Sequence, residues 1–247
     1  MLFRSDLLGN VWRFDINDNL PPGGLEASLI GTTKTTSGTA QPITVRPELA
    51  ELNGKPMVFV ATGRLLGSAD LSDTQSQSVY GIVDPLAGNP AYADLRAVLR
   101  PLVMTTSGDG TYRTASCTGA LCGSTDGWVV DLPDSGERVN VEMELVLGTL
   151  IVGSNIPGDN ACEFGGRAWI NYLNFSDGSA VITSPNGSVS TFIAGGLIVG
   201  TKTIQLPDTG QFKTEIRTSD TRTRAGDPPI RSAAPRGNRI SWREIAQ

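Results

Sequence analysis

The feature of this sequence that most constrains its fold is a repeated alternation of apolar and polar residues within short segments. The clearest example is RVNVEMELVLG, which begins at Arg138. Its apolar residues are Val139, Val141, Met143 and Leu145, and its polar residues are Asn140, Glu142 and Glu144. A period of two indicates a strand with one covered face and one wet face. From Val146 the run becomes apolar throughout, as expected for a strand buried on both faces.

Other segments rich in β-branched and aromatic residues predict further strands. These segments are Pro56–Gly63, Ser78–Asp84, Gly127–Pro133, Arg138–Ile156, Arg167–Phe175, Ser190–Leu206 and Phe212–Thr218. Turn-forming clusters such as SGDG, PDSGE, SPNGS and PDTG separate them, in a chain with 29 glycines and 15 prolines. Helical spacing is found only in NPAYADLRAVLRPLV, which predicts one short helix ending at Pro101. The sequence therefore predicts an all-β fold.

Composition removes several classes of function. The chain has no histidine, so Ser-His and Cys-His catalytic pairs are excluded and a zinc site is disfavoured. The formal net charge is −5, with no basic stripe, which disfavours nucleic-acid binding. The sequence contains no run of 18 apolar residues, so it predicts no transmembrane helix. We expect no catalytic, cofactor-binding or metal-binding residues in this chain.

The three cysteines leave two interpretations open. Cys117 and Cys122 have four residues between them in CTGALC, so they could form a local disulfide or remain two free thiols. A disulfide would imply export, yet the opening MLFRSDLLGN has no apolar signal-peptide region. We therefore expect that N-terminal sequence precedes this chain. The partner of Cys162, if it has one, is not indicated.

A pattern recurs in GNVWRFD, SVYGIVD and GRAWINYLN. Each copy has a small residue, an aromatic residue flanked by apolar ones, and a closing Asp or Asn; the aromatics are Trp12, Tyr80 and Trp169. Such a repeat is typical of β-propeller blades, with these aromatics packing between blades and long insertions in the loops. On this interpretation SDLLGNVWRFDI ends a blade whose first strands lie upstream. The alternative is three unrelated strands that each carry an aromatic residue.

Seven blocks in order resemble one known family. They are DLLGNVWRFDI, AQPITVRPEL, VFVATGRLL, QSVYGIVD, GWVVDLPDSGERV, CEFGGRAWINYL and RISWREI. Together they are similar to the C-terminal β-propeller of the PilC/PilY family of type IV pilus biogenesis and tip-adhesin factors. The resemblance implies a partial, modified β-propeller of about three blades with long loop insertions over residues 1–219, lacking upstream blades. Residues 220–247 would then form a polar Arg/Pro-rich tail ending in a short apolar segment.

The same resemblance implies a non-enzymatic role in pilus assembly and tip adhesion, supporting pilus extension. The expected partners are major and minor pilins and the assembly machinery, with host-cell or surface ligands as further candidates. The expected location is the periplasm, the outer membrane and the pilus tip. The alternative is a fragment of a quinoprotein dehydrogenase propeller, which would need a base, a calcium ion and tryptophan surfaces around the quinone.

Calcium binding is a property of the family that the resemblance does not transfer. The family's Asp/Asn-rich loop lies before the strand equivalent to SDLLGNVWRFDI, and only MLFR stands there in this sequence. Asp15, Asn17, Asn19 and Glu26 have the spacing of EF-hand ligands, but Leu20 replaces the required glycine. We expect a solvated turn there. Arg46 and Arg64 are expected to pair with nearby acidic residues.

Overall fold

The computed structural model describes residues 1–20, 23, 27–158 and 165–230. Strands dominate this part of the chain, and its helices are single short 3₁₀ segments. They are η1 (Ser68–Ser72), η2 (Leu95–Ala97), η3 (Ala120–Gly123) and η4 (Pro185–Gly187). The prediction of an all-β fold is therefore confirmed.

The strands form three sheets. The first has three antiparallel strands in the order β1-β2-β3. Its strands are β1 (Leu2–Ser5), β2 (Asn10–Phe14) and β3 (Ala27–Thr32). The last is also a three-stranded antiparallel meander. Its strands are β14 (Ile198–Gln205), β15 (Phe212–Thr218) and β16 (Thr223–Gly226), so residues that the sequence analysis assigned to the polar tail form β16.

Between them lies a ten-stranded sheet in the order β10-β11-β12-β13-β8-β7-β9-β6-β5-β4. Its first half comprises β4 (Glu48–Leu52), β5 (Lys55–Ala61), β6 (Ser78–Val83) and β9 (Gly127–Asp131). Its second half comprises β10 (Glu144–Val146), β11 (Thr149–Pro157), β12 (Gly166–Asn174) and β13 (Ser188–Ile193). The strands β7 (Arg100–Thr106) and β8 (Tyr112–Ser116) join the halves. Every pairing is antiparallel except that of β7 with β9.

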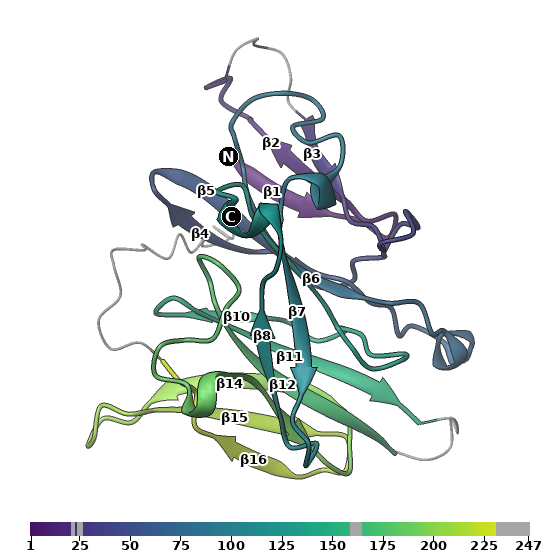
Figure 1. The fold of residues 1–247 in the computed structure, drawn as a ribbon, viewed down its shortest axis with the longest axis vertical. Coiled ribbons are helices and arrows are strands. Elements are labelled where there is room, and N and C mark those ends of the chain that lie inside the picture. Colours follow the sequence, from purple (N-terminus) through teal and green to yellow (C-terminus); the bar gives the residue numbers. More distant parts are fainter. Residues whose placement is uncertain (21–22, 24–26, 159–164, 231–247) are drawn as a thin grey trace, which may run out of the picture.

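Three apolar clusters show that these sheets pack face to face as four layers (Figure 1). Val11 and Ile30 of the first sheet pack against Val58 and Val60 of β5. The largest cluster lies between the halves of the ten-stranded sheet, for example Phe59 against Leu150 and Val152. In the third, β11 and β12 pack against the last sheet through Ile151, Ile170, Ile198 and Ile216. This stacking of small sheets along the chain is the propeller-like arrangement expected from the repeat.

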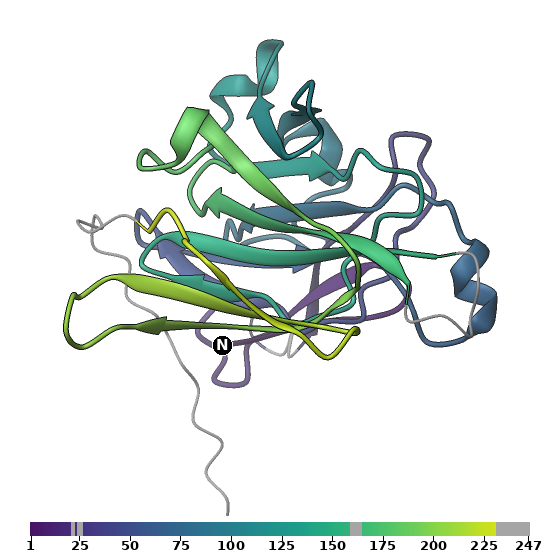
Figure 2. The ribbon, with the colours of Figure 1, turned by 90° about the horizontal axis from the view of Figure 1, so that it is seen from below.

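One long insertion, residues 84–126 between β6 and β9, covers the outer edges of the first three layers (Figures 1 and 2). Its backbone amides at Ala91 and Tyr92 donate to the carbonyls of Leu29 and Ile30 on β3, both at 2.8 Å. Its strands β7 and β8 then extend β9 and β13. At the opposite edge of the ten-stranded sheet, β4 and β10 contact each other. The insertion therefore turns two separate blades into one continuous sheet.

Three local predictions were wrong. The expected helix before Pro101 is a single 3₁₀ turn, η2, followed directly by β7, which contains Pro101. The segment Arg138–Ile156 is not one strand: Arg138 forms only an isolated bridge, residues 139–143 are not in a strand, and Leu147 and Gly148, with φ angles of 46° and 83°, form the turn between β10 and β11. Ser190–Leu206 is likewise divided between β13 and β14. The uniformly apolar run in β11 is nevertheless buried on both faces.

Candidate functional site

The three repeated aromatics occupy related positions in successive layers. Tyr80 lies on β6, between β5 and β9, and Trp169 lies on β12, between β11 and β13. Trp12 lies on β2, between β1 and β3. Tyr80 and Trp169 are buried, whereas Trp12 is half-buried. Each of these strands is therefore second from the outer edge of its layer, where the edge strands are β3, β9 and β13. The strands β7 and β8 of the insertion are left out of this description.

The polar atom of each aromatic has a partner, as expected for buried Trp and Tyr side chains. The indole nitrogen of Trp12 donates to Asp6 at 3.1 Å, and that of Trp169 donates to Asp134 at 3.0 Å. The Tyr80 hydroxyl donates to Gln41 Oε1 at 2.6 Å. These contacts connect the strands to loops and fix the aromatic rings in place.

Asp6 organises the SDLLGN turn between β1 and β2. Its carboxylate accepts hydrogen bonds from the amides of Leu8 and Asn10, at 2.9 and 3.0 Å, as well as from Trp12. Burial alone would raise the pKa of Asp6, but these hydrogen bonds outweigh it, so the pKa lies below its ordinary value. Leu7 and Leu8 are left exposed and line a shallow hollow with Leu66.

The loop between β5 and β6, residues 62–77, contains the 3₁₀ turn η1 and is held by two charged residues. Asp70 holds it from within by accepting hydrogen bonds from the amides of Leu66 and Gly67, at 2.8 and 3.1 Å. Arg64 Nε donates to the same carboxylate at 2.7 Å, which agrees with the ion pair expected for Arg64. These contacts hold the pKa of Asp70 below its ordinary value, and the hydrogen bond from the amide of Leu66 has the largest effect.

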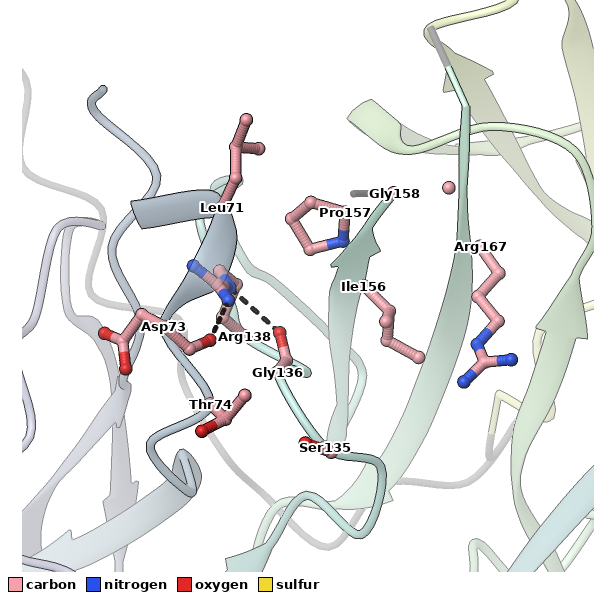
Figure 3. Close-up of a pocket in the computed structure, with 11 residues that line it drawn as sticks. Leu71, Asp73, Thr74, Ser135, Gly136, Arg138, Ile156, Pro157, Gly158 and Arg167 are labelled. Carbon is pink, nitrogen blue, oxygen red and sulfur yellow. Dashed lines mark hydrogen bonds between the residues drawn. The ribbon is translucent and has the colours of Figure 1, made fainter. Parts of the chain in front are cut away.

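Arg138 holds the same loop from outside (Figure 3). Its guanidinium donates to the carbonyl oxygens of Gly136 and Arg64, at 2.9 and 3.0 Å. It also donates to the carbonyl oxygens of Asp70 and Asp73. The residue is 3% exposed, and burial lowers the pKa of its guanidinium. One buried cation therefore connects four backbone carbonyls.

A cavity of about 420 Å³ opens beside Arg138. One wall is the β5–β6 loop, the second is the segment before Arg138, and the third is formed by the facing ends of β11 and β12 (Figure 3). Its lining is Leu71, Asp73, Thr74, Ser135, Gly136, Arg138, Ile156, Pro157, Gly158, Gly166 and Arg167. The cavity combines apolar walls with hydroxyl and guanidinium groups.

The residue before Arg138 faces a different network. Glu137 has a fully buried side chain and accepts two hydrogen bonds from Arg113, at 2.8 and 2.9 Å. Arg113 is also fully buried, pairs with Asp134 at 3.0 Å and lies 3.8 Å from the ring centroid of Trp169. This network fastens β8 to the second half of the sheet. Sequence reasoning missed it, because Arg113 and Glu137 are 24 residues apart and nothing in the block GWVVDLPDSGERV, which contains Glu137, indicates a partner for that residue.

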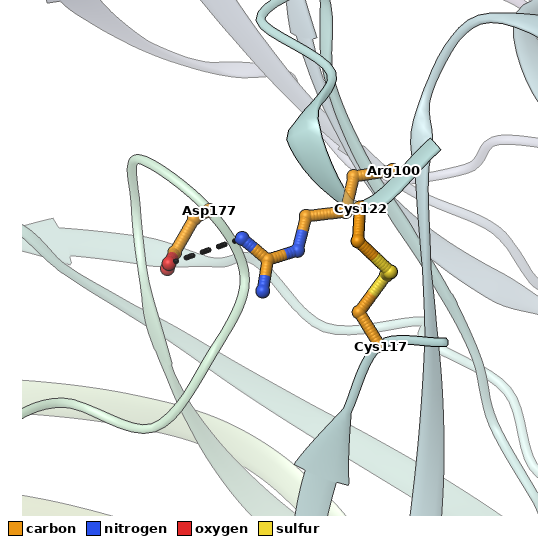
Figure 4. The surroundings of a disulfide bond; sticks show 4 residues. All are labelled: Arg100, Cys117, Cys122 and Asp177. Carbon is orange, nitrogen blue, oxygen red and sulfur yellow. Dashed lines mark hydrogen bonds and ion pairs between the residues drawn. A yellow bond between two sulfur atoms is a disulfide. The ribbon is translucent and has the colours of Figure 1, made fainter. Parts of the chain in front are cut away.

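Cys117 and Cys122 form a disulfide at the end of β8, with an S–S distance of 2.05 Å (Figure 4). The bond joins the last turn of the insertion, η3, to this strand. Nearby, Arg100 on β7 extends toward Asp177, with 3.5 Å between the charged groups (Figure 4). The insertion is therefore attached at several separate points.

The remaining candidates do not assemble into a metal centre in the described residues. Asp15 is buried and accepts a hydrogen bond from the amide of Leu20 at 2.7 Å, while Asn17 and Asn19 are exposed. Glu26 and Cys162 lie outside the described residues. No group of three or more acidic or cysteine residues in the described ranges is arranged to hold a metal ion. Arg46 lies near Glu48 and Glu142, at 3.6 and 3.9 Å.

None of the described helices has the length and apolar character needed to cross a membrane. No protein-family model matches the chain. Two curated proteins of Xylella fastidiosa (strain Temecula1), each described as a type IV pilus biogenesis factor PilY1 homolog, align with nearly all of it. The first is 28% identical over 99% of this chain and 21% of the relative. The second is 25% identical over 95% of this chain and 16% of the relative. The chain spans at most about a fifth of the length of these relatives.

Proposed function

We propose that this chain, which belongs to the PilY1 family of type IV pilus biogenesis factors, acts in pilus assembly as part of a non-enzymatic factor that supports pilus extension. The observation that supports this role most directly is the alignment over 99% of the chain with a protein described as a pilus biogenesis factor. The stacked layers agree with the propeller that the sequence blocks imply.

The construction of the loops is typical of a rigid scaffold that presents surfaces. Asp70 and Arg138 form hydrogen bonds with the backbone of the β5–β6 loop, and Arg113 and Glu137 form an ion pair. Such a loop can bind a partner with little loss of conformational freedom. We expect pilins and the assembly machinery to be the partners, with adhesion to a surface or host cell as a further role.

Export to the periplasm, the outer membrane and the pilus tip fits the chemistry of the insertion. The Cys117–Cys122 disulfide is of a kind that forms and persists in oxidising compartments. A pilus factor at the cell surface would carry this bond throughout its working life.

The outer face of the first sheet supports a place within a larger propeller. Val11 and Ile30 point into the molecule, so side chains alternate and Trp12, Phe14 and Leu29 point to the opposite face. These three are only half-buried. We expect this face to pack against a further sheet of a longer polypeptide. The sheets from β1 to β16 would then be consecutive blades of that propeller, so the last blade extends past residue 219 to Gly226.

Removal of this region from the bacterium that encodes it tests the proposed role. We expect an in-frame deletion of the segment to reduce surface pilin, measured in sheared fractions, while total cellular pilin stays unchanged. Restoring the segment should restore surface pili. Normal pili and surface motility in the deletion strain would contradict the proposal. So would dye-linked alcohol oxidation by the purified protein after addition of a quinone and calcium.

A further inference from the structure

The last sheet has fewer strands than the two layers before it. The second and third layers each have four strands of their own, and the fourth strand, β9 or β13, is antiparallel to the third, β6 or β12. In the described part of the chain the last sheet has three, β14, β15 and β16. Because β14 contacts β10, the first strands of the last two layers lie on the same side, so β16 stands third and its outer edge lacks a partner strand among the described residues.

The backbone groups on this edge point away from the sheet. The amide of Thr218 on β15 donates to the carbonyl of Arg222 at 3.0 Å, so the residues at every second position after Arg222 direct their backbone groups to β15. Thr223 and Ala225 lie at the alternate positions, and both are exposed. Their amide and carbonyl groups therefore form an unpaired edge that a further strand could extend.

The third layer is left partly uncovered beside this edge. Thr191 on β13 pairs with Ile170 on β12, so both side chains point to the same face of the layer. Ile170 is buried against the last sheet, whereas Thr191 is exposed. The last sheet therefore covers β12 but stops short of Thr191, and a strand added beside β16 would extend the cover toward β13.

The chain carries a segment suited to this edge. The segment RISWREI, residues 239–245, lies outside the described residues. In its sequence the apolar residues Ile240 and Trp242 alternate with the polar residues Ser241 and Arg243. This period of two predicts a strand with one covered face.

The connection between β16 and this segment has a suitable length. It comprises residues 227–238, and the equivalent connection between β12 and β13 comprises residues 175–187. Three prolines and a Gly-Asn pair in the first connection favour turns. Because edge and segment belong to one chain, the segment has an effective concentration on the order of millimolar, which favours it over a strand from another molecule.

We propose that residues 239–245 pair with the outer edge of β16 as an antiparallel fourth strand and so complete the last sheet. Ile240 and Trp242 face the third layer and cover the surface around Thr191. The occupant of the free edge is thus a segment of the same chain. This pairing is independent of the proposed role in pilus assembly.

The pairing pattern follows from the faces of β16. Arg224 pairs with the buried Ile216 of β15, so its side chain points toward the third layer. Residues directly opposite each other share a face, so the apolar residues of the segment lie opposite Arg224 and its inward-facing neighbour on β16. Ser241, between them, lies opposite Thr223 or Ala225 and exchanges both backbone hydrogen bonds with it.

Amide hydrogen exchange, measured by NMR on the purified 247-residue chain, tests the proposal. We expect the amides of Thr223 and Ala225 to exchange at least about ten-fold more slowly than unprotected amides, as for groups that are hydrogen-bonded about nine-tenths of the time. The amide of Arg224 donates to β15 and should be protected in every variant. It therefore reports that β16 itself remains paired.

Two matched proline variants identify the occupant. Ser241→Pro removes an amide that donates to β16, so exchange at Thr223 and Ala225 should become about ten-fold faster and reach the unprotected rate. Ser232→Pro makes the same change within the connection and should leave their protection unchanged. Three results would overturn the proposal: no protection in the wild-type chain, equal protection in Ser241→Pro, or protection that increases with protein concentration. The last result would identify a second copy of the chain as the occupant.

Discussion

Two buried arginines, Arg113 and Arg138, have different hydrogen-bond partners for their guanidinium groups. Arg113 is fully buried between two carboxylates and the face of Trp169, so its charge is neutralised by opposite charge. Arg138 is almost as buried but is surrounded by four carbonyl oxygens. Glu137, the partner of Arg113, is the residue next to Arg138 and points into the other network.

The difference separates two tasks within this fold. A buried ion pair resists change because removal of either partner leaves the other charge without solvent. A cation bound by carbonyls also fixes the backbone, and the carboxylates of Asp73 and Asp70 act on Arg138 through charge, with no hydrogen bond between them and its guanidinium. The first network therefore attaches the insertion to the sheet, and the second shapes a loop beside a cavity.

The largest expected effect is that of Arg113→Met. This change leaves the buried carboxylate of Glu137 without its cation, although Ser154 and the amide of Asp134 still donate to it. We expect the free energy of unfolding to fall by about 3–5 kcal/mol, as for other broken buried pairs. Urea denaturation measures the loss.

A double variant serves as the control for this pair. Arg113→Met combined with Glu137→Gln leaves no unpaired charge, so it should be less destabilising than the two single changes added together. A loss below about 1 kcal/mol for Arg113→Met alone would show that the pair does not hold β8 in place.

Arg138→Met should cost less and act more locally. The four carbonyls lose a shared donor, but the β5–β6 loop that carries three of them can move and accept hydrogen bonds from water, so we expect a loss of about 2 kcal/mol in the free energy of unfolding. Hydrogen exchange should show faster exchange at Leu66 and Gly67 in the β5–β6 loop. Arg113→Met should instead accelerate exchange in β8 and β13. The same pattern in both variants would contradict the division between the two networks.

The disulfide is a further attachment of β8, and the third prediction removes it. Cys117→Ser combined with Cys122→Ser opens a loop of sequence separation five, and the chain-entropy argument gives a loss of about 2 kcal/mol. Thermal unfolding with and without a reductant measures it. Wild-type protein treated with dithiothreitol should match the double variant. If reduction leaves the melting temperature unchanged, Arg113 alone holds this strand.

The smallest expected effect concerns Asp6, an anion held by hydrogen-bond donors much as Arg138 is held by acceptors. Its folded-state pKa lies below the value of 3.8 for an unperturbed Asp, so its stabilising contribution is present above that value and lost as the pH falls through the folded pKa. Asp6→Asn should reduce the loss of melting temperature between pH 5 and pH 2. Asp208→Asn at an exposed turn is the control, and an equal change in both variants would contradict this assignment.

The strands predicted from sequence are those whose pattern is local. In β5, β6, β12 and β15 each apolar or aromatic residue is determined by the segment itself, and their positions follow the predicted ranges closely. The threonine-rich strands β7 and β8 were missed, because their pairing with β9 and β13 depends on distant residues. The false helix arose because Leu95 and Leu99, four residues apart, both reach the apolar cluster beside the first sheet from a short turn.

The candidate cavity could not be predicted in the same way. Arg138 was visible as the first residue of an alternating run and Arg167 as the first residue of a predicted strand, and both stand in blocks that resemble the family, but no pattern related one to the other. Their relation arises because Arg138 bridges Asn155 on β11, Arg167 on β12 pairs with Ile156 of β11, and the β5–β6 loop forms another wall of the same cavity. The repeated aromatics could be found because each lies in a similar local sequence pattern. The cavity is lined by segments that are distant in the sequence and meet only in the folded chain.

The insertion that covers three sheet edges also sets the order in which the chain can fold. Tyr112 on β8 pairs with Thr191 on β13, which is synthesised much later, so the hairpin of β7 and β8 has one unpaired edge until the C-terminal half is available. Contacts of such long sequence separation slow folding, and unpaired edges promote aggregation while they last. During synthesis from the N-terminus, the chain therefore passes through a period in which this hairpin needs protection, and the ten-stranded sheet is completed only when β13 pairs with β8.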